Sequence, residues 1–190
     1  MDVALVLPAF ALLLVPMIAI ALLVKLTSRG PIFYIAQRVG HEGCTFPFPK
    51  FRSMRINADR LRGTLLGTPD EEMLTRYQND PRITAFGKFL RRFSLDELPQ
   101  LWSVLRGHMS IVGPRPILLE ELPLLSESDH RRHIVKPGLT GLWQISGRKE
   151  VPWQDRMDMD LEYIREWNLR LDAKILLRTI PAVIRGSGAY

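Results

Sequence analysis

The sequence predicts a mostly α-helical, membrane-associated protein with short β elements. Three observations lead to this fold class. An apolar block from Val3 to Val24 contains no charged side chain, apolar residues farther along recur at helical spacing, and short extended segments carry prolines. Of the 190 residues, 46% are apolar and 24% are charged. The mean hydropathy is near zero because it averages an apolar N-terminal block with a charged body.

The N-terminal block is long enough to enter a membrane. A bilayer's hydrocarbon core is ~30 Å thick, which about 20 helical residues span. A secretory signal does not fit, because no basic segment precedes the block and no small-residue cleavage motif follows it. Pro8 and Pro16 lie inside it, where a proline removes one helical hydrogen bond. The pattern is compatible with a kinked spanning helix and with a hairpin, broken at Pro16, that leaves by the face it entered.

The charges place the body of the protein in the cytoplasm. Lys25 and Arg29 follow the apolar block, and Lys25 to Arg106 holds 14 Lys and Arg against 8 Asp and Glu. Basic flanks stay on the cytoplasmic side, and they attract anionic lipids and phosphorylated substrates. We expect no nucleic acid partner, because no nucleic-acid recognition module is present. The single cysteine, Cys44, excludes an internal disulfide framework.

The first half of the body alternates short elements. Extended segments are predicted at Pro31–Tyr34 and at Phe46–Phe51, the second broken by Pro47 and Pro49. Residues 57–79 are polar and predicted to be helical in part. Apolar residues between Ile83 and Phe93 then recur at helical spacing, with basic residues on the other faces. This pattern is typical of an amphipathic helix at a membrane interface, and equally of a helix packed on a core.

Two further helical stripes occupy the C-terminal part. The first consists of Leu161, Ile164, Trp167 and Leu171. The second contains Ile175, Leu176, Thr179, Ile180, Val183 and Ile184. We expect Pro181 to kink or end the last helix, because a proline in a helix interior disrupts its hydrogen bonding.

The densest chemical pattern is Ser94-Leu-Asp-Glu-Leu-Pro-Gln-Leu101. Ser94 and Glu97 have the spacing of a capping box, so Asp96 and Glu97 fit an ordinary first helical turn, where negative charge is favoured. Pro99 conflicts with a regular helix that starts at Ser94. The helix therefore starts nearer Leu98, or its first turn is distorted and presents two adjacent carboxylates to a substrate and a metal.

Two loops carry candidate phosphate ligands. In Gly113-Pro-Arg-Pro116, the prolines hold Arg115 in a rigid extended turn, and the guanidinium fork suits a phosphate. The glycine-rich run that begins at Lys136 ends at Arg148, a second candidate, although it matches no phosphate-loop pattern. Each segment is also compatible with a plain surface loop.

Two shorter patterns are less specific. Asp158-Met-Asp160 matches the Asp-x-Asp metal motif of other nucleotide-sugar transferases, but three-residue matches are common and this one lies in a helical stripe. His130 and His133 are three residues apart without obvious companion ligands, so a solvated face is favoured over a zinc site.

Several longer motifs together resemble one family. The run from Asp80 to Pro116 is similar to the bacterial sugar transferases, the monotopic phosphoglycosyl transferases of exopolysaccharide, O-antigen and glycoprotein assembly. The resemblance covers nearly the whole chain and extends to Ser28-Arg-Gly-Pro-Ile-Phe, Lys50-Phe-Arg-Ser-Met54, Lys136-Pro-Gly-Leu-Thr-Gly141 and Gly186-Ser-Gly-Ala-Tyr190.

The resemblance implies a specific reaction. Members transfer a sugar 1-phosphate from a UDP-sugar to undecaprenyl (polyprenyl) phosphate, releasing UMP and using Mg²⁺. It implies that Asp96 is the nucleophile of a covalent phosphosugar–aspartate intermediate, and that Glu97 assists as metal ligand or base. Arg91, Arg115 and Arg148 match family basic positions and are phosphate-binding candidates. Asp160 matches a family carboxylate and is a candidate metal ligand with Asp96 and Glu97.

The resemblance also implies a topology. It favours a re-entrant membrane helix broken at Pro16, in residues 1–26, followed by a membrane-docked catalytic domain, residues 27–190, on the cytoplasmic face of the bacterial inner membrane. Val15 stands where members often have serine, which removes one partner for a freed carbonyl at the break. Two other hypotheses stay open: a metal-dependent glycosyltransferase using Asp158 and Asp160, and a non-catalytic membrane-docking protein.

Overall fold

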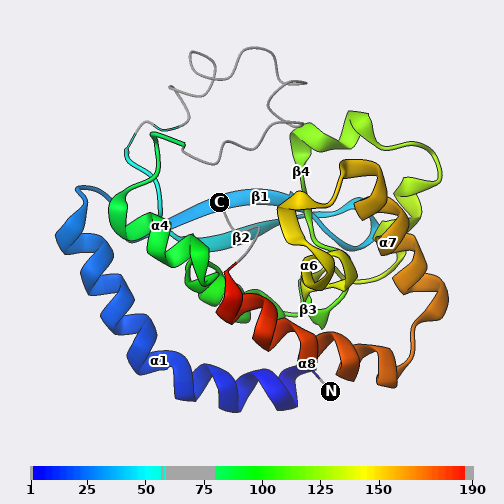
Figure 1. Ribbon diagram of the computed structural model, residues 1–190, viewed down its shortest axis with the longest axis horizontal. Helices are drawn as coiled ribbons and strands as arrows, with labels where there is room; N and C mark the ends of the chain where they lie inside the picture. Colours follow the sequence, from blue (N-terminus) through cyan, green and yellow to red (C-terminus); the bar gives the residue numbers. More distant parts are fainter. Residues whose placement is uncertain (1, 57, 59–79, 187–190) are drawn as a thin grey trace.

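The computed structural model describes residues 2–56, 58 and 80–186 (Figure 1). Helices and 3₁₀ turns dominate, and the strands are short, as the sequence predicts. The segment predicted to be partly helical at residues 57–79 lies outside the described residues, apart from Ala58, and so do the last four residues.

The N-terminal helix α1 (Asp2–Thr27) runs without interruption through Pro8 and Pro16. The expected helix is confirmed, but its division at Pro16 into two helices of a hairpin is wrong. Figure 1 shows one helix that bends as it follows the lower left edge of the molecule. A proline costs one hydrogen bond and clashes with the preceding turn, and a helix can relieve both by bending rather than ending.

The strands form two small sheets. In the first, β1 (Phe33–Val39) lies between β2 (Thr45–Phe51) and β4 (Ile117–Leu118), all antiparallel. The second pairs β3 (Ser110–Val112) with β5 (Gly138–Thr140) in parallel. Contrary to the sequence prediction, Pro47 and Pro49 do not break β2. They are two residues apart, so both lack an N–H on one side of the strand, and β2 is an edge strand paired with β1 alone.

The remaining elements surround the sheets. The helices are α4 (Ala85–Arg92), α5 (Leu101–Leu105), α6 (Leu142–Ser146), α7 (Trp153–Glu166) and α8 (Leu169–Arg185). The 3₁₀ turns are η1 (His41–Gly43), η2 (Leu95–Gln100), η3 (Leu119–Leu124), η4 (Asp129–Ile134) and η5 (Arg148–Glu150).

The C-terminal region differs from the sequence prediction at the junction of its two helices and at Pro181. The predicted stripe from Leu161 to Leu171 crosses two helices, because Asn168 caps a new helix by accepting a hydrogen bond from the Leu171 N–H at 2.9 Å. Pro181 does not end α8, which continues to Arg185 and is followed by Gly186 at φ 65°. Figure 1 shows this last helix along the lower part of the molecule.

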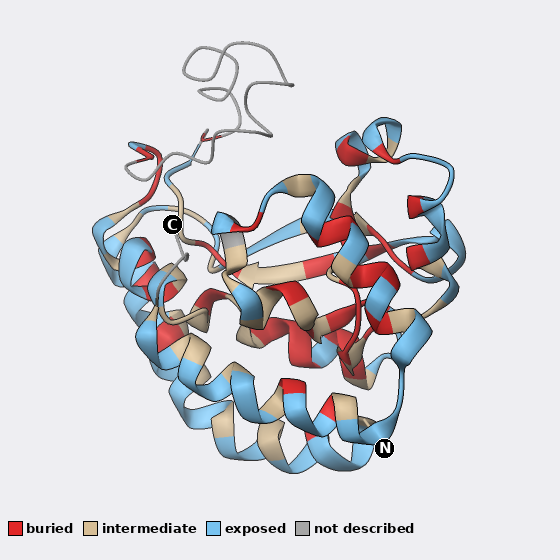
Figure 2. Ribbon diagram, turned by 45° about the vertical axis from the view of Figure 1, so that its right-hand side comes forward, coloured by how far each residue is buried: buried red, intermediate tan, exposed pale blue. Residues whose placement is uncertain are grey.

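One side of α1 contacts the domain along most of its length. Near its start, Val6 packs with Phe46, Phe48, Leu101, Val104 and Met109. Near its end, Ile20 and Val24 pack with Phe51 and Leu90. The other side carries exposed apolar residues, such as Leu12, which is 79% exposed. In Figure 2 the buried residues gather at the centre, and most of the long helix is coloured as exposed.

Candidate active site

The predicted Asp96–Glu97 pair lies in a distorted turn between α4 and α5. Ser94 has left-handed backbone angles, φ 54° and ψ 21°, and its side chain makes no capping hydrogen bond. The expected capping box is therefore absent. The chain instead forms the 3₁₀ turn η2 through Pro99 and then becomes regular helix at Leu101. Of the two alternatives that Pro99 raised, the distorted first turn is confirmed.

The Glu97 carboxylate is held by two cations. Lys50 Nζ, on β2, donates to Oε1 at 2.7 Å. Arg115 forks onto the same carboxylate, with Nη1 at 3.0 Å from Oε2 and Nη2 on Oε1. The Arg115 and Lys50 charges outweigh burial and hold the pKa of Glu97 well below its usual range. Glu97 is therefore ionised at neutral pH and is a poor proton acceptor.

Asp96, the adjacent carboxylate, has a different environment. It is 4% exposed, and no hydrogen bond from a described residue reaches its carboxylate. Burial and the neighbouring Glu97 charge raise its pKa, although Lys50 and Arg91 act in the opposite direction. Asp96 is a carboxylate with free lone pairs at the edge of a cationic cluster. This is the state expected of a nucleophile before substrate binds.

The three predicted phosphate ligands gather around these carboxylates. Arg115 contacts Glu97 directly, and Arg91 of α4 acts electrostatically on Asp96. The Arg148 guanidinium interacts with the charges of both Glu97 and Arg115, and its buried Nη1 has no hydrogen-bond partner among the described residues. With Lys50, four cations surround two carboxylates, so the cluster carries excess positive charge that suits a diphosphate.

Asp158 and Asp160 do not join this cluster. Asp158 is exposed on α7, whereas Asp160 is 1% exposed and pairs with Arg132 of η4. Burial raises the pKa of Asp160 to about 6 even though Arg132 opposes the shift. Within residues 2–56, 58 and 80–186, no group of three His, Cys, Asp or Glu residues could hold a metal. The carboxylate that fits Mg²⁺ is Asp96, since Mg²⁺ commonly binds one or two carboxylates plus substrate phosphates.

The sequence prediction missed two residues of this region. Lys50 lies in one of the motifs quoted above, but neither its charge nor its spacing linked it to Glu97, which is 47 positions away. Arg132 lies between two histidines that drew attention as possible metal ligands. Its partner Asp160 is 28 positions away. Only the tertiary fold brings these partners together.

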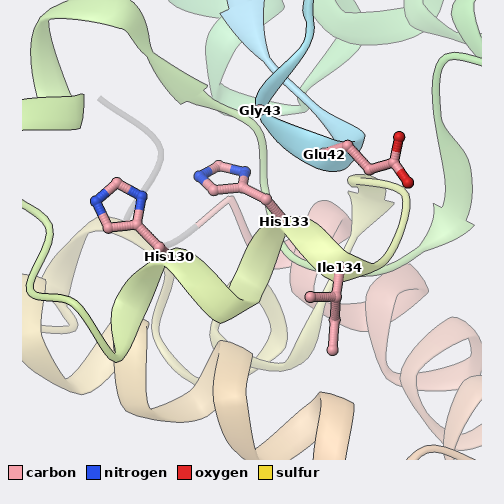
Figure 3. A pocket seen from close by; sticks show the side chains of 5 residues that line it. All are labelled: Glu42, Gly43, His130, His133 and Ile134. Carbon is pink, nitrogen blue, oxygen red and sulfur yellow. The ribbon is translucent and has the colours of Figure 1, made fainter.

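An open cavity of about 280 Å³ lies elsewhere, lined by Glu42, Gly43, His130, His133 and Ile134. Figure 3 shows the two imidazoles on the same side of η4, with the Glu42 carboxylate directed away from them. His133 Nδ1 lies 3.1 Å from the Gly40 carbonyl oxygen, and burial lowers the pKa of His133 to about 4. This histidine is therefore neutral at physiological pH, and the cavity contains none of the cations around Asp96.

Comparison with known proteins gives a consistent result. A family model described as "Bacterial sugar transferase" matches residues 1–186. The chain is 47% identical, over 88% of its length and 76% of the relative's, to "Exopolysaccharide production protein ExoY" of Sinorhizobium fredii. It is 46% identical over 85% of its length to "Undecaprenyl-phosphate galactose phosphotransferase" of Salmonella typhimurium. It is 44% identical over 92% to "UDP-glucose:undecaprenyl-phosphate glucose-1-phosphate transferase" of Xanthomonas campestris. The chain spans about a third of the last two relatives, 35% and 36%.

Proposed function

The chain belongs to the bacterial sugar transferase family, and from this membership and its η2 site we propose that it transfers a sugar 1-phosphate from a UDP-sugar to undecaprenyl phosphate, releasing UMP. This reaction is the first membrane step in the assembly of an exopolysaccharide or related glycoconjugate. The observation that carries the proposal is a pair of adjacent carboxylates beside Lys50, Arg91, Arg115 and Arg148, in which Glu97 is held by two cations and Asp96 accepts no hydrogen bond from a described residue.

Asp96 is the nucleophile in this proposal. An Asp96 oxygen attacks the phosphorus that carries the sugar, the bond between this phosphorus and the bridging oxygen breaks, and UMP leaves with that oxygen. A phosphate oxygen of undecaprenyl phosphate then attacks the same phosphorus, which releases the Asp96 carboxylate and forms the undecaprenyl diphosphate sugar. Covalent catalysis divides one displacement into two easier ones.

The cations bind and neutralise the phosphates. Arg148 supplies a guanidinium nitrogen that no described residue contacts by a hydrogen bond, and Arg91 and Arg115 flank the carboxylates. Glu97 keeps Lys50 and Arg115 in place, and its low pKa favours this role over that of a base. Asp96 with the substrate diphosphate would hold Mg²⁺, which would neutralise charge on the phosphates. The buried Asp160, paired with Arg132, does not fit as a ligand.

We also propose that α1 enters the cytoplasmic membrane from the cytoplasmic face and returns to it. Asp2–Thr27 is long and apolar enough to cross a membrane, judged by length and composition. However, Val6 near its start and Val24 near its end are both 2% exposed because both pack on the body, residues 27–190. A perpendicular spanning helix would carry one end ~30 Å from that body. The contacts at both ends therefore support a re-entrant helix.

Exposed apolar side chains support docking of the body on the same membrane. They include Phe89 of α4 and Trp102 of α5, each 50% exposed, and Leu177, Ile180 and Ile184 of α8, each at least 60% exposed. Basic residues lie close by: the Arg106 guanidinium lies over the Trp102 ring, and that of Arg92, at the end of α4, lies over Phe93. Apolar residues together with Lys and Arg are the composition that binds anionic lipid surfaces.

The reaction is tested by product analysis. The protein in detergent or nanodiscs is incubated with undecaprenyl phosphate, Mg²⁺ and a panel of UDP-sugars, and the released nucleotide is identified. We expect UMP from at least one UDP-sugar and loss of its release with EDTA. Release of UDP instead would indicate a glycosyltransferase. Binding to anionic liposomes without any turnover would indicate a non-catalytic docking protein.

The topology is tested separately by cysteine labelling. Asp2→Cys is introduced into a Cys44→Ser background, and a membrane-impermeant maleimide is applied to inside-out and right-side-out vesicles. We expect labelling in inside-out vesicles, because both ends of α1 would face the cytoplasm. Labelling in right-side-out vesicles would contradict the re-entrant helix and indicate a spanning one.

A further inference from the structure

We propose that the buried Arg132–Asp160 pair is a positioning device for the site, which fixes the main chain of Arg115 and thereby aims its guanidinium at Glu97 and at a bound diphosphate. The inference rests on the proposed function for its catalytic consequence. Its geometric part concerns two residues that contact neither carboxylate of the η2 site.

The contact that carries the proposal is made by one nitrogen. Arg132 Nη2 donates to the main-chain oxygen of Arg115 at 2.6 Å and also to Asp160 Oδ2. Asp160 belongs to α7, Arg132 to η4 and Arg115 to the loop that precedes β4. The pair therefore links the buried face of α7 to the main chain of the residue whose side chain forks onto Glu97.

This link is one of three that hold consecutive carbonyls of the loop. Gly138 N donates to the Pro114 oxygen at 2.8 Å, and Arg38 Nη1 lies 3.4 Å from the Pro116 oxygen. The oxygen between them, on Arg115, receives Arg132. The outer two oxygens belong to prolines, whose rings already restrict the backbone. Arg115 has no ring of its own, although Pro116 restricts it to extended backbone angles, and the buried Arg132 guanidinium holds its carbonyl oxygen.

Burial argues against a role in stability alone. Arg132 and Asp160 are 3% and 1% exposed, and the buried Arg132 Nε and Nη1 have no hydrogen-bond partner within residues 2–56, 58 and 80–186. Replacing a buried ion pair by apolar residues is often neutral or stabilising, because desolvation offsets the attraction. The pair is therefore better explained by what it holds, the main-chain oxygen of Arg115, than by its contribution to stability.

The test compares Arg132→Met, Arg132→Lys and Asp160→Asn with a matched control, Asp129→Asn. Asp129 is 2% exposed in the same turn, and its carboxylate accepts from the Ser126 N–H of its own segment. Each variant is assayed for melting temperature, UDP affinity by calorimetry, and kcat and KM for UMP release. The melting temperature reports the structural cost that all four substitutions share.

We expect Arg132→Met and Asp160→Asn to lower kcat by about 10²-fold, the effect of a displacement near 1 Å. We expect UDP affinity to fall by about tenfold, the value of one charge-assisted hydrogen bond. Arg132→Lys should retain part of the kcat and part of the UDP affinity, because the lysine ammonium can bridge the main-chain oxygen of Arg115 and the Asp160 carboxylate. Asp129→Asn should change the melting temperature to a similar extent with UDP affinity and kcat within about threefold.

A double-mutant cycle tests whether Arg132 acts through Arg115. If Arg132 acts through Arg115, Arg132→Met causes no further loss of UDP affinity in an Arg115→Met background. Additive losses, or equal losses in the Asp129→Asn control, would overturn the positioning role. The binding arm requires no turnover. If the wild type binds UDP but releases no UMP, the proposed function is refuted, and the double-mutant cycle still tests the positioning role. If the wild type binds no UDP, the proposed function and the positioning role are both refuted.

Discussion

Two pairs of closely spaced carboxylates occupy different regions of the molecule and have different surroundings. Asp96 and Glu97 lie in η2 among Lys50, Arg115 and two further arginines. Asp158 and Asp160 lie in α7, where the first is exposed and the second is buried against Arg132. In the sequence alone, both pairs are short acidic motifs that are compatible with an enzyme acting on nucleotide sugars.

Backbone geometry explains the difference. Residues two apart on an α-helix are rotated by about 200°, so an Asp-x-Asp in a regular helix directs its side chains to opposite faces. Asp158 and Asp160 therefore cannot share a ligand without unwinding α7. The distorted turn at Pro99 instead places consecutive carboxylates beside β2, with Lys50 on that strand. The number of carboxylates is equal, and the local backbone decides which pair can do chemistry.

Asp96→Asn should have the largest effect, because the amide keeps the shape of the side chain but cannot form the acyl phosphate. We expect UMP release to fall by at least about 10³-fold, as for the removal of a nucleophile. The matched measurements are UDP affinity and liposome binding, which should stay close to wild type. Full turnover in this variant would remove Asp96 from the reaction.

Glu97→Gln should have the next largest effect and should shift the pH profile. Asp96 must be ionised to attack, and its raised pKa means that kcat falls with decreasing pH at a higher pH than for an ordinary aspartate. The substitution removes a neighbouring negative charge and frees Lys50 and Arg115, and both changes lower the Asp96 pKa. We therefore expect kcat to fall by roughly 10–100-fold from misplaced cations and the acidic limb to move to lower pH.

The measurement for this variant is kcat at saturating UDP-sugar across the pH range in which the wild type is folded. An acidic limb that stays in place or moves to higher pH would contradict the assignment of that limb to Asp96. The melting temperature at each pH serves as the control, because unfolding would produce the same loss of rate.

The parts of the fold that could be predicted are those that depend on residues close together in the sequence. The apolar block became α1 because its composition alone dictates a helix, and Ile83–Phe93 became α4 because its period is local. The prediction of a break at Pro16 was wrong because a proline constrains only one helical turn. Contacts along the whole helix decide whether the helix bends or ends at that turn. The prediction of one helical stripe from Leu161 to Leu171 was wrong because Asn168 caps a new helix. The apolar residues on either side of this cap have helical spacing only by coincidence.

The site was predictable only in part. The residue pattern left open whether Asp96 and Glu97 lie in an ordinary helical turn or in a distorted one that presents them to a substrate and a metal, and the family resemblance singled them out. Their opposite pKa shifts depend on Lys50 and Arg115, which are distant in sequence and which no periodicity identifies. The same resemblance suggested a metal-binding role for Asp160, although Arg132 occupies its carboxylate.

Arg148→Met should have an intermediate effect that appears mainly in KM. Its guanidinium interacts with the charges of Glu97 and Arg115, and one of its buried nitrogens has no partner in the part of the chain that the structure describes, so a substrate phosphate is the expected acceptor. Loss of one charge-assisted hydrogen bond should raise KM for the UDP-sugar by about tenfold with a smaller change in kcat. The control is Arg165→Met, an exposed arginine of α7. Equal changes in both variants would indicate a general charge effect rather than a phosphate ligand.

Asp158→Asn should have the smallest effect and gives the sharpest contrast between the two pairs. Asp158 is exposed on the side of α7 opposite Asp160, and an exposed substitution of this kind changes stability by about 0.5 kcal/mol or less. We expect kcat and KM for UMP release within about twofold of wild type, whereas Asp160→Asn should lower kcat strongly through Arg132. An Asp-x-Asp metal motif requires the opposite, that both substitutions abolish turnover together and that added Mg²⁺ partly restores it. Parallel Mg²⁺ titrations of the two variants separate a metal motif from two aspartates that share a helix but no ligand.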